Sequence, residues 1–325
     1  MSSLNTNASA MTALQTLSLT NKNLATTQSR ISTGFRVSEA SDNAAYWSIA
    51  TTMRSDNKAF STVQDALGLG AGKLDVAYTG MNSAIEKVDE IKQKLLSAMG
   101  ASDEDKGKIH TEIKELQGHL KGIAKAANYA GSNLLLGDPN EQPEQFEIVA
   151  SYDRATSGAI SVNKIVITLV DDDDALTVGL MQLDDQGEFE ADIGLLGTAW
   201  DLDDFEEYDG LTPTSILGLE LVDDTGVAVD DDYILGALAN LEIVVGKLTD
   251  AAAILGAAKT RVANQSDFVS KLQDAIDRGV GQLVDADMNK ESARLSALQV
   301  QQQLGIQALS IANSNTQNIL SLFRG

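Results

Sequence analysis

Apolar residues recur every three or four positions over most of both halves of the chain, a spacing that predicts long amphipathic α-helices. The longest run covers 46 positions, from Leu238 to Leu283, in one register; this is roughly 69 Å of helix at 1.5 Å per residue. Two further runs extend over 53–98 and 109–127, the second behind a capping sequence at 102–105. Glycines at 68, 70 and 72 weaken the first run and allow a kink or break there. Helices this long and one-sided need partners that cover the apolar stripe.

The two ends of the chain carry weaker stripes of the same period. The first consists of Ala10, Leu14, Leu17, Leu24 and Ile31, with Asn21 and Gln28 as polar interruptions. The second consists of Leu295, Leu298, Leu309, Ala312, Ile319 and Phe323, with Gln302, Gly305 and Thr316 between them. A short, interrupted stripe supplies little hydrophobic driving force. We therefore expect both ends to be loose in the isolated monomer and ordered on assembly.

A polar break, "SRISTGFRVSEASDNAAYWSIA" at 29–50, separates the first stripe from the next helix. The sequence Ser-Thr-Gly at 32–34 predicts a turn. Residues 38–43 offer helix caps for a helix that begins near Ala44, with Asp42 the best N-cap candidate. Tyr46 and Trp47 follow directly and place two aromatic side chains at the start of that helix.

The apolar period changes from 3.6 to 2 in the middle of the chain. Ile165, Ile167 and Leu169 alternate with other residues as in a strand, and 178–183 suggests a second strand. Between 138 and 232 there are 26 Asp plus Glu against only Arg154 and Lys164, whereas the rest of the chain is nearly neutral. The expected fold is therefore mainly α with an inserted, acidic, β-rich domain.

Composition excludes several classes of function. The net charge of −23 leaves no basic surface for nucleic acid. The chain has no Cys, so thiolate chemistry and disulfides are excluded. Its two histidines, His110 and His119, are nine residues apart on one predicted helix and face opposite sides; we interpret both as solvated. No phosphate-binding or dinucleotide fingerprint is present. We assign no catalytic residue, no cofactor and no metal ligand.

Acidic clusters at 171–174, 201–204 and 230–232 raise an alternative, a calcium site. None has the regular spacing of a calcium-binding loop, so solvated turns are the preferred interpretation.

The first 17 residues lack the basic start and apolar core of a secretory signal, and no run of 18 apolar residues occurs. Taken alone, this pattern predicts a cytoplasmic protein without membrane insertion. The prediction fails if the protein is exported by a route that uses no cleaved signal.

Both ends of the chain resemble bacterial flagellin, the subunit of the flagellar filament. The resemblance rests on "LNTNASAMTALQTLSLTNKNLATTQSRISTGFRVSEASDNAAYWSIA" at the start and "LVDADMNKESARLSALQVQQQLGIQALSIANSNTQNILSLFRG" at the end. It covers residues 1–137 and 236–325, and the acidic middle corresponds to the variable insert of the family.

The resemblance implies five segments and their arrangement. Residues 1–47 would form an inner-tube helix with a spoke, our name for 29–50, and 285–325 the second inner-tube helix, the two paired as a coiled coil. Residues 48–137 and 236–284 would form a helical rod domain, and 138–235 an outward variable domain. The implied inner-tube contacts are Leu14, Leu17, Leu24, Ile31, Leu298, Leu309, Ile319 and Phe323, and the implied spoke contacts are Asp42, Tyr46 and Trp47.

The implied function is a structural subunit, not an enzyme, that polymerises for swimming motility. Its partners would be other copies of itself, the junction and cap proteins and an export chaperone. The flagellar export apparatus would place it outside the cell without a cleaved signal. The alternative is a hook-filament junction protein of the same family.

Two segments that host receptors recognise in flagellins are altered in this chain. In the spoke, residues 39–43 and 45–47 depart from the pattern read by plant receptors. In the segment read by the animal Toll-like receptor, an anchoring arginine is replaced by Glu90, and Lys94 also departs from the pattern. We expect weak or absent recognition; the alternative is that Glu90 is only an exposed rod residue.

Overall fold

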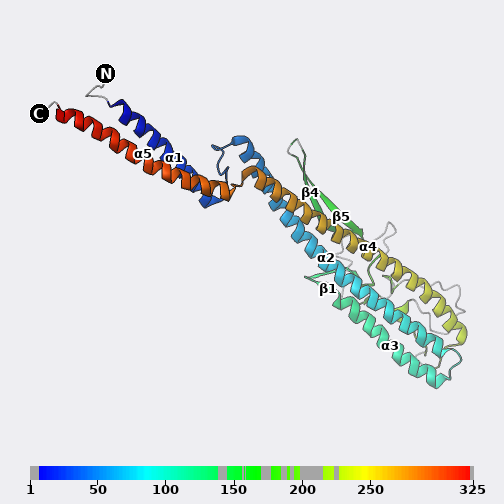
Figure 1. Ribbon diagram of the computed structural model, residues 1–325. Coiled ribbons are helices and arrows are strands. Elements are labelled where there is room, and N and C mark those ends of the chain that lie inside the picture. Colours follow the sequence, from blue (N-terminus) through cyan, green and yellow to red (C-terminus); the bar gives the residue numbers. More distant parts are fainter. Residues whose placement is uncertain are drawn as a thin grey trace. The chain divides into compact units, whose positions relative to one another are not determined.

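The computed structural model describes residues 7–137, 145–155, 157, 159–169, 177–183, 189–190, 194–197, 215–222 and 227–322. Long helices dominate this part of the chain (Figure 1). The helices are α1 (Ala8–Thr33), α2 (Ala44–Ala98), α3 (Asp103–Ala126), the short 3-10 helix η2 (Ile216–Gly218), α4 (Asp231–Val284) and α5 (Met288–Leu322). The strands are β1 (Asn128–Tyr129), β2 (Ser132–Asn133), β3 (Leu136–Gly137), β4 (Gln145–Arg154), β5 (Ile160–Thr168), β6 (Met181–Leu183) and β7 (Phe189–Glu190).

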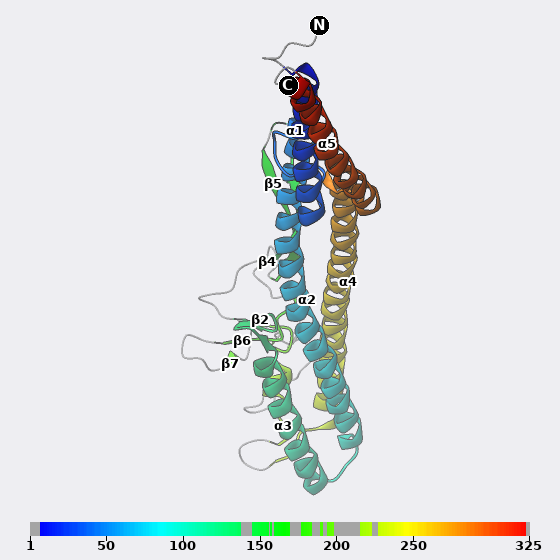
Figure 2. The same cartoon turned by 60° about the vertical axis from the view of Figure 1, so that its left-hand side comes forward.

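The chain forms two compact units, one of residues 1–58 with 272–325 and one of 59–271. In the second unit α2 lies between α3 and α4 (Figures 1 and 2). The stripe predicted on α2 is confirmed, because its members are at most 9% exposed: Phe60, Val63, Leu67, Leu74, Ala77, Met81, Ala84, Val88, Ile91, Leu95 and Ala98. This stripe is the centre of the second unit's core.

The stripe predicted on α4, which ran through Leu241, Val245, Leu248, Ala252, Leu255, Lys259 and Val262, was half right. Leu241, Leu248, Leu255, Val262 and Val269 are buried as expected. Between them the buried residues are Val244, Ala251 and Ala258 rather than their C-terminal neighbours. The neighbour of Ala258 is Lys259, which instead pairs with Asp75 of α2 at 2.7 Å. The buried positions alternate by three and four residues, as expected of a helix in a coiled-coil seam.

The glycines do not break the helix, since α2 is one continuous helix from Ala44 to Ala98. Gly70 has a packing role, because a Cβ there would lie 2.7 Å from Ile148 of β4. Its missing side chain therefore lets the β4–β5 hairpin lie directly on the helix.

The β4–β5 hairpin confirms a strand at 165–168. Its strands are antiparallel, with a register shift between Val149 and Ser151. Ile165 and Ile167 are buried while Val166 is 41% exposed, so one face of the hairpin packs on the helices. Tyr152 meets Phe60 of α2 edge to face at 5.9 Å, and Gln265 of α4 donates to the carbonyl of Ala150 at 2.9 Å. The second predicted strand is present in part as β6, which pairs with β3 and β7.

The polypeptide returns to the helices through residues 215–222, which lie on α3. The Gln117 amide donates to the carbonyls of Ile216 and Leu219 at 2.9 and 3.0 Å. Lys114 pairs with Glu220 at 3.1 Å. Gln117 is buried and was missed from the sequence, where the stripe of α3 was assigned to aliphatic residues.

The interpretation of both histidines as solvated was wrong for His110. Its Nδ1 accepts the backbone N–H of Leu221 at 3.1 Å, so the ring is neutral there and carries its proton on Nε2. Burial and the nearby Lys114 lower its pKa below 6.5, against an opposing effect of Glu220. The groups that face it are thus Lys114 on its own helix and Glu220 on the return segment.

We predict that acid loosens the return segment through His110. Because the pKa of His110 is lower in the folded chain, its contribution to stability is fully present above about pH 6.5 and is lost as the pH falls through the folded pKa. The protection factor of the Leu221 amide against hydrogen exchange should therefore fall between about pH 7 and 5. In His110→Gln the pH-dependent part of this change should disappear, whereas His119→Gln should behave as the unmodified chain. Equal pH profiles for all three proteins would contradict the assignment.

Candidate self-association surface

Helices α1 and α5 form an antiparallel pair in the first unit. Asn7 donates to the carbonyl of Ala312 at 2.9 Å, and Gln302 donates to Asn21 at 2.7 Å. The side chains that face each other recur by three and four residues. They are Ala10, Ala13, Leu17, Thr20, Leu24, Thr27 and Ile31 on α1, and Glu291, Leu295, Leu298, Gln302, Gly305, Leu309 and Ala312 on α5. We call these positions the seam; their spacing is that of a coiled coil.

The seam is thin and partly polar. Thr20 and Thr27 are buried in it, and the Thr20 hydroxyl donates to the carbonyl of Thr16 at 2.9 Å. A Cβ at Gly305 would lie 3.3 Å from Leu17, so the missing side chain lets the helices approach closely. Each such position buries little apolar area, so the seam contributes less hydrophobic free energy than the core of the second unit.

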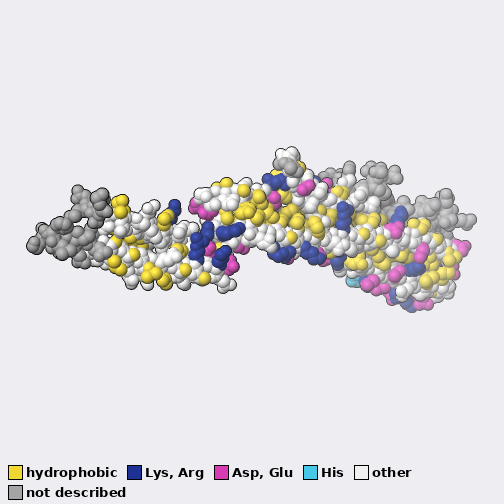
Figure 3. Space-filling model, turned by 45° about the horizontal axis from the view of Figure 1, so that its top comes forward, with side chains coloured by type: hydrophobic (Ala, Val, Ile, Leu, Met, Phe, Trp, Pro, Cys, Tyr) yellow, Lys and Arg dark blue, Asp and Glu magenta, His cyan; other side chains and the backbone are white. Residues whose placement is uncertain are grey.

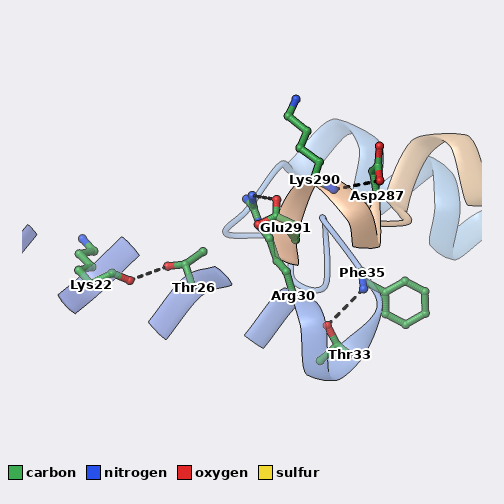
Figure 4. Close-up of polar contacts among 8 residues, drawn as sticks. All are labelled: Lys22, Thr26, Arg30, Thr33, Phe35, Asp287, Lys290 and Glu291. Carbon is green, nitrogen blue, oxygen red and sulfur yellow. Dashed lines mark hydrogen bonds and ion pairs between the residues drawn. The ribbon is translucent and has the colours of Figure 1, made fainter. Parts of the chain in front are cut away.

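One ion pair fixes the end of the seam. Arg30 Nη1 lies 3.4 Å from Glu291 Oε1, and the Glu291 side chain is only 9% exposed (Figure 4). Glu291 Oε2 is buried without a hydrogen-bond partner in the part of the chain that the structure describes. Asp287 Oδ1 accepts from the N–H groups of Asn289 and Lys290 and caps α5. Without Arg30 the carboxylate of Glu291 would be a buried, unpaired charge, which is costly.

Large apolar side chains are also exposed on α1 and α5, and Figure 3 shows separate yellow patches on the visible face of this pair. Each is 54–63% exposed: Met11, Leu14 and Leu19 on α1, and Val300, Leu304, Ile306 and Ile311 on α5. We call this set the outer face. These side chains lie outside the seam and point in several directions, so they are available for contact with more than one other copy.

The structure divides the residues predicted for the inner tube. Leu17, Leu24, Ile31, Leu298 and Leu309 lie in the seam within one chain. Leu14 does not; it is 58% exposed on the outer face, because Ala13 takes the seam position. The side chain of Ile319 and the whole of Phe323 lie outside the described residues. The other outer-face residues were not singled out from the sequence, although their apolar character was visible there.

The spoke folds back on the C-terminal end of α4. Gly34 ends α1 with φ 77°, a left-handed conformation that glycine adopts without strain. The N–H groups of Arg36 and Val37 then donate to the carbonyl of Val284 at 2.6 and 3.2 Å. Val37, Ala50, Val280 and Val284 form a small buried cluster that includes the partly buried Phe35, Met53, Ile276 and Leu283. This cluster anchors the spoke within the first unit.

The sequence suggested Asp42 as the N-cap of α2, and this was wrong. The N-cap is Asn43, since its Oδ1 accepts from the N–H of Tyr46 at 3.1 Å. Asp42 instead accepts from the backbone N–H groups of Ser38 and Glu39 and from the Ser38 hydroxyl. These bonds hold the pKa of Asp42 below its usual value and close the turn one residue earlier.

Aromatic side chains and arginines gather at the start of α2. Arg36 lies 5.9 Å from the ring centre of Tyr46, and Arg54 lies 4.7 Å from that of Phe35. Tyr46 and Trp47 are 40% and 38% exposed. Both predicted spoke aromatics therefore remain accessible at the surface of one chain.

The two positions predicted to alter host recognition are on α2 in the second unit. Glu90 pairs with Lys87 at 2.6 Å, and Lys94 pairs with Glu112 of α3 at 2.5 Å. The side chains of Glu90 and Lys94 are 45% and 42% exposed.

The described residues hold no group of three or more His, Cys, Asp or Glu placed to bind a metal. Of the acidic clusters, 171–174 and 201–204 lie outside the described residues. Asp231, from the third, accepts from Lys106 at 3.0 Å and from the N–H of Gly100 at 3.2 Å, so it joins the ends of α3, α2 and α4. No helix in the described ranges is long and apolar enough to cross a bilayer.

Comparison with known proteins identifies relatives over the whole chain. Residues 4–139 match the bacterial flagellin N-terminal helical region, and 238–323 match the bacterial flagellin C-terminal helical region. The chain is 53% identical to a flagellin of Brucella melitensis biotype 1 over 325 residues, with full coverage of both chains. It is 45% identical to flagellin C and 42% identical to flagellin A of Rhizobium meliloti strain 1021, again with full coverage of both. The span between the two matched regions, 140–237, coincides with the acidic insert.

We predict different costs for two leucine truncations on α5. Leu298 is 7% exposed in the seam, so Leu298→Ala should lower the free energy of unfolding by about 2 kcal/mol. Leu304 is 57% exposed, so Leu304→Ala should change it by less than about 0.5 kcal/mol. Urea unfolding followed by circular dichroism, with hydrogen exchange of the α1 and α5 amides, measures both. Equally small changes would contradict the packing of Leu298 in the free chain and would support ends that order only on assembly.

Proposed function

The chain belongs to the bacterial flagellin family, and from this premise we propose that copies of it polymerise through the outer face of α1 and α5. It is a structural subunit of the flagellar filament, which is extracellular and serves swimming motility, and it is not an enzyme. The observation that supports the proposed surface is this set of large apolar side chains, each more than half exposed in one copy. Other copies bury these side chains in the filament, where each contact is repeated along a helical, non-closing assembly.

The seam and the outer face have separate roles in this proposal. The seam orients α1 and α5 with respect to each other within one copy, through Arg30 and Glu291 among others. The outer face supplies the apolar area that other copies cover. Leu14 is thus proposed as a contact between copies, and Leu17 and Leu24 as contacts within one copy.

We propose that the spoke adds a second contact between copies. Tyr46 and Trp47 are exposed at the first turn of α2, next to Ile49, which is 49% exposed. Aromatic side chains give large contact areas at little cost in conformational entropy. The cluster around Val37 and Val284 holds the backbone that carries them.

The remaining partners are the junction and cap proteins and an export chaperone, and we propose that all three bind the outer face. These proteins must recognise a subunit either before it polymerises or at an end of the polymer, where the outer face is not covered by other copies. We further propose export by the flagellar apparatus without a cleaved signal. Mass spectrometry of an exported protein that lacks at most the initiator methionine would support that route, and loss of a longer N-terminal segment would contradict it.

We predict that polar substitutions on the outer face stop filament growth. Purified chain added to filament fragments should elongate them, as seen by electron microscopy, whereas a junction protein would not. Leu304→Ser with Ile311→Ser should abolish elongation and the binding of the chaperone, because both side chains lose their apolar area without changing the seam. Trp47→Ala should slow the elongation of the filament fragments.

Gln301→Ser is the matched control, since Gln301 is an exposed polar residue on the same helix. Deletion of 1–31 or 288–325 should leave a soluble chain that does not polymerise. Normal filaments from the double serine variant would refute the proposed surface.

We propose weak recognition by host receptors. Glu90 and Lys94 are accessible and already paired with charges of this chain, so a receptor site built for arginine at the first position meets the wrong charge. Reporter cells for the Toll-like receptor should respond poorly to the protein, and a 29–50 peptide should give little oxidative burst in plant tissue. Glu90→Arg should raise the reporter response, whereas Glu115→Arg on α3 should not. A full response to the unmodified protein would overturn the proposal.

A further inference from the structure

The second unit carries a small groove between α2 and the end of α3. It has a volume of about 360 Å³, and Val76, Thr79, Gly80, Ser83, Ile123 and Ala126 line it. Beside it Gly80 lets Leu135 and Ala127 pack directly on α2, since a Cβ at Gly80 would lie 2.6 Å from Leu135 and 3.3 Å from Ala127. The volume lies at the lower end of the range for ligand pockets, which favours a single large side chain as the occupant.

The same unit exposes a large aromatic side chain on α4. Phe268 is 57% exposed. Two turns earlier on the same face is Arg261, also exposed, which makes no ion pair with any residue in the described ranges. Phenylalanine and arginine on one exposed helix face offer an aromatic ring and a cation to a partner, and arginine and aromatic side chains often lie at the centre of protein interfaces.

A complementary charge lies beyond the groove. Glu86 is exposed on α2 seven residues after Thr79, the same spacing that separates Arg261 from Phe268. It too makes no ion pair within the described part of the chain. On α2, Thr79 of the groove is thus separated from Glu86 by the same number of residues that separates Phe268 from Arg261 on α4.

Within one copy these two pairs are out of reach of each other. Helices α2 and α4 are antiparallel, as the ion pairs Lys259–Asp75 and Lys92–Glu242 show. Phe268 and Thr79 lie on opposite sides of the Lys259–Asp75 pair along the helix axis. Their separation along this axis corresponds to 13 residues, or roughly 20 Å. Arg261 and Glu86 are separated by the same 13 residues, so one displacement brings both pairs together.

We infer that Phe268 of one copy inserts into the groove of a second copy displaced by roughly 20 Å along α2, and that Arg261 of the first copy pairs with Glu86 of the second. The two copies have the same orientation. In this orientation α4 of one copy lies antiparallel to α2 of the next, which is the arrangement that the matched spacings require. The contact joins two different surfaces of the same unit. Such a contact does not close on itself and continues from copy to copy. The identity of the occupant rests on the proposed function, because that function supplies the second copy.

Cross-linking in this cysteine-free chain tests the register directly. Arg261→Cys with Glu86→Cys leaves Phe268 and the groove intact. In filaments treated with a short bis-maleimide, this pair should give a ladder of linked copies on a denaturing gel. Each single variant, and the matched pair of Arg261→Cys with Ser97→Cys, an exposed α2 position 11 residues beyond Glu86, should give no ladder.

Charge exchange provides an independent test. Arg261→Glu should slow the elongation of filament fragments by about tenfold, because it places like charges opposite each other. Addition of Glu86→Arg should restore most of the rate. Filaments that grow normally but give no ladder and no rescue would overturn this contact and leave the proposed function standing. Failure of the unmodified chain to elongate fragments would instead overturn the proposed function.

Discussion

A helix of fifty residues with one apolar stripe is stable in water only when another helix covers that stripe. Both units of this chain satisfy this constraint, and they do so with side chains of different size. In the second unit the stripe of α2 consists largely of Leu, Val, Ile and Met, and its members from Leu67 to Ala98 are fully buried. In the first unit the seam of α1 and α5 contains Thr20, Thr27, Gln302 and Gly305 in equivalent positions. Since hydrophobic free energy scales with buried apolar area, the second unit is the more stable part of a free chain.

The insert depends on the same helices. The β4–β5 hairpin has no second sheet beneath it in the described residues; it packs on α2 where Gly70 removes a side chain, and it is held to α4 through Gln265. The return segment lies on α3 through Gln117 and His110. A two-stranded hairpin is marginal by itself, so the helices supply the surface that keeps these strands in place. Much of the insert's sequence can therefore vary without disturbing the rod, provided that these few contacts remain.

Periodicity was enough to predict the helices and the stripe of α2, where members such as Leu74, Val88 and Ile91 have charged neighbours on both sides. It was not enough on α4, where neighbours such as Val244 and Val245, or Ala251 and Ala252, are equally apolar and the period alone does not choose between them. Gln117 and Lys106 were missed because their acceptors come from residues 216–231, about a hundred positions away. The stripe predicted near the start of the chain ran through Leu14, whereas in the structure Ala13 takes the corresponding position of the seam. In the structure close packing against α5 favours the smaller residue, and the leucine remains outside.

Ala13 lies in the seam and Leu14 outside it, which illustrates how folding and assembly can depend on different side chains of one chain. If the larger residues all faced inward, α1 and α5 would form a strong pair. The polar side chains left outside would then give little favourable free energy on contact with other copies. Small or polar residues such as Ala13, Thr20 and Gly305 alternate with leucines in the seam and weaken the pair. The free energy of burying Leu14, Leu304 and Ile311 is gained only when another copy covers them. Binding that is available only to the ordered pair stabilises it by mass action, so order at the ends of the chain rises with the concentration of binding partners. The rod, whose stripe is covered within one copy, needs no such help. Stability of the monomer and growth of the polymer therefore depend on different side chains of the same sequence.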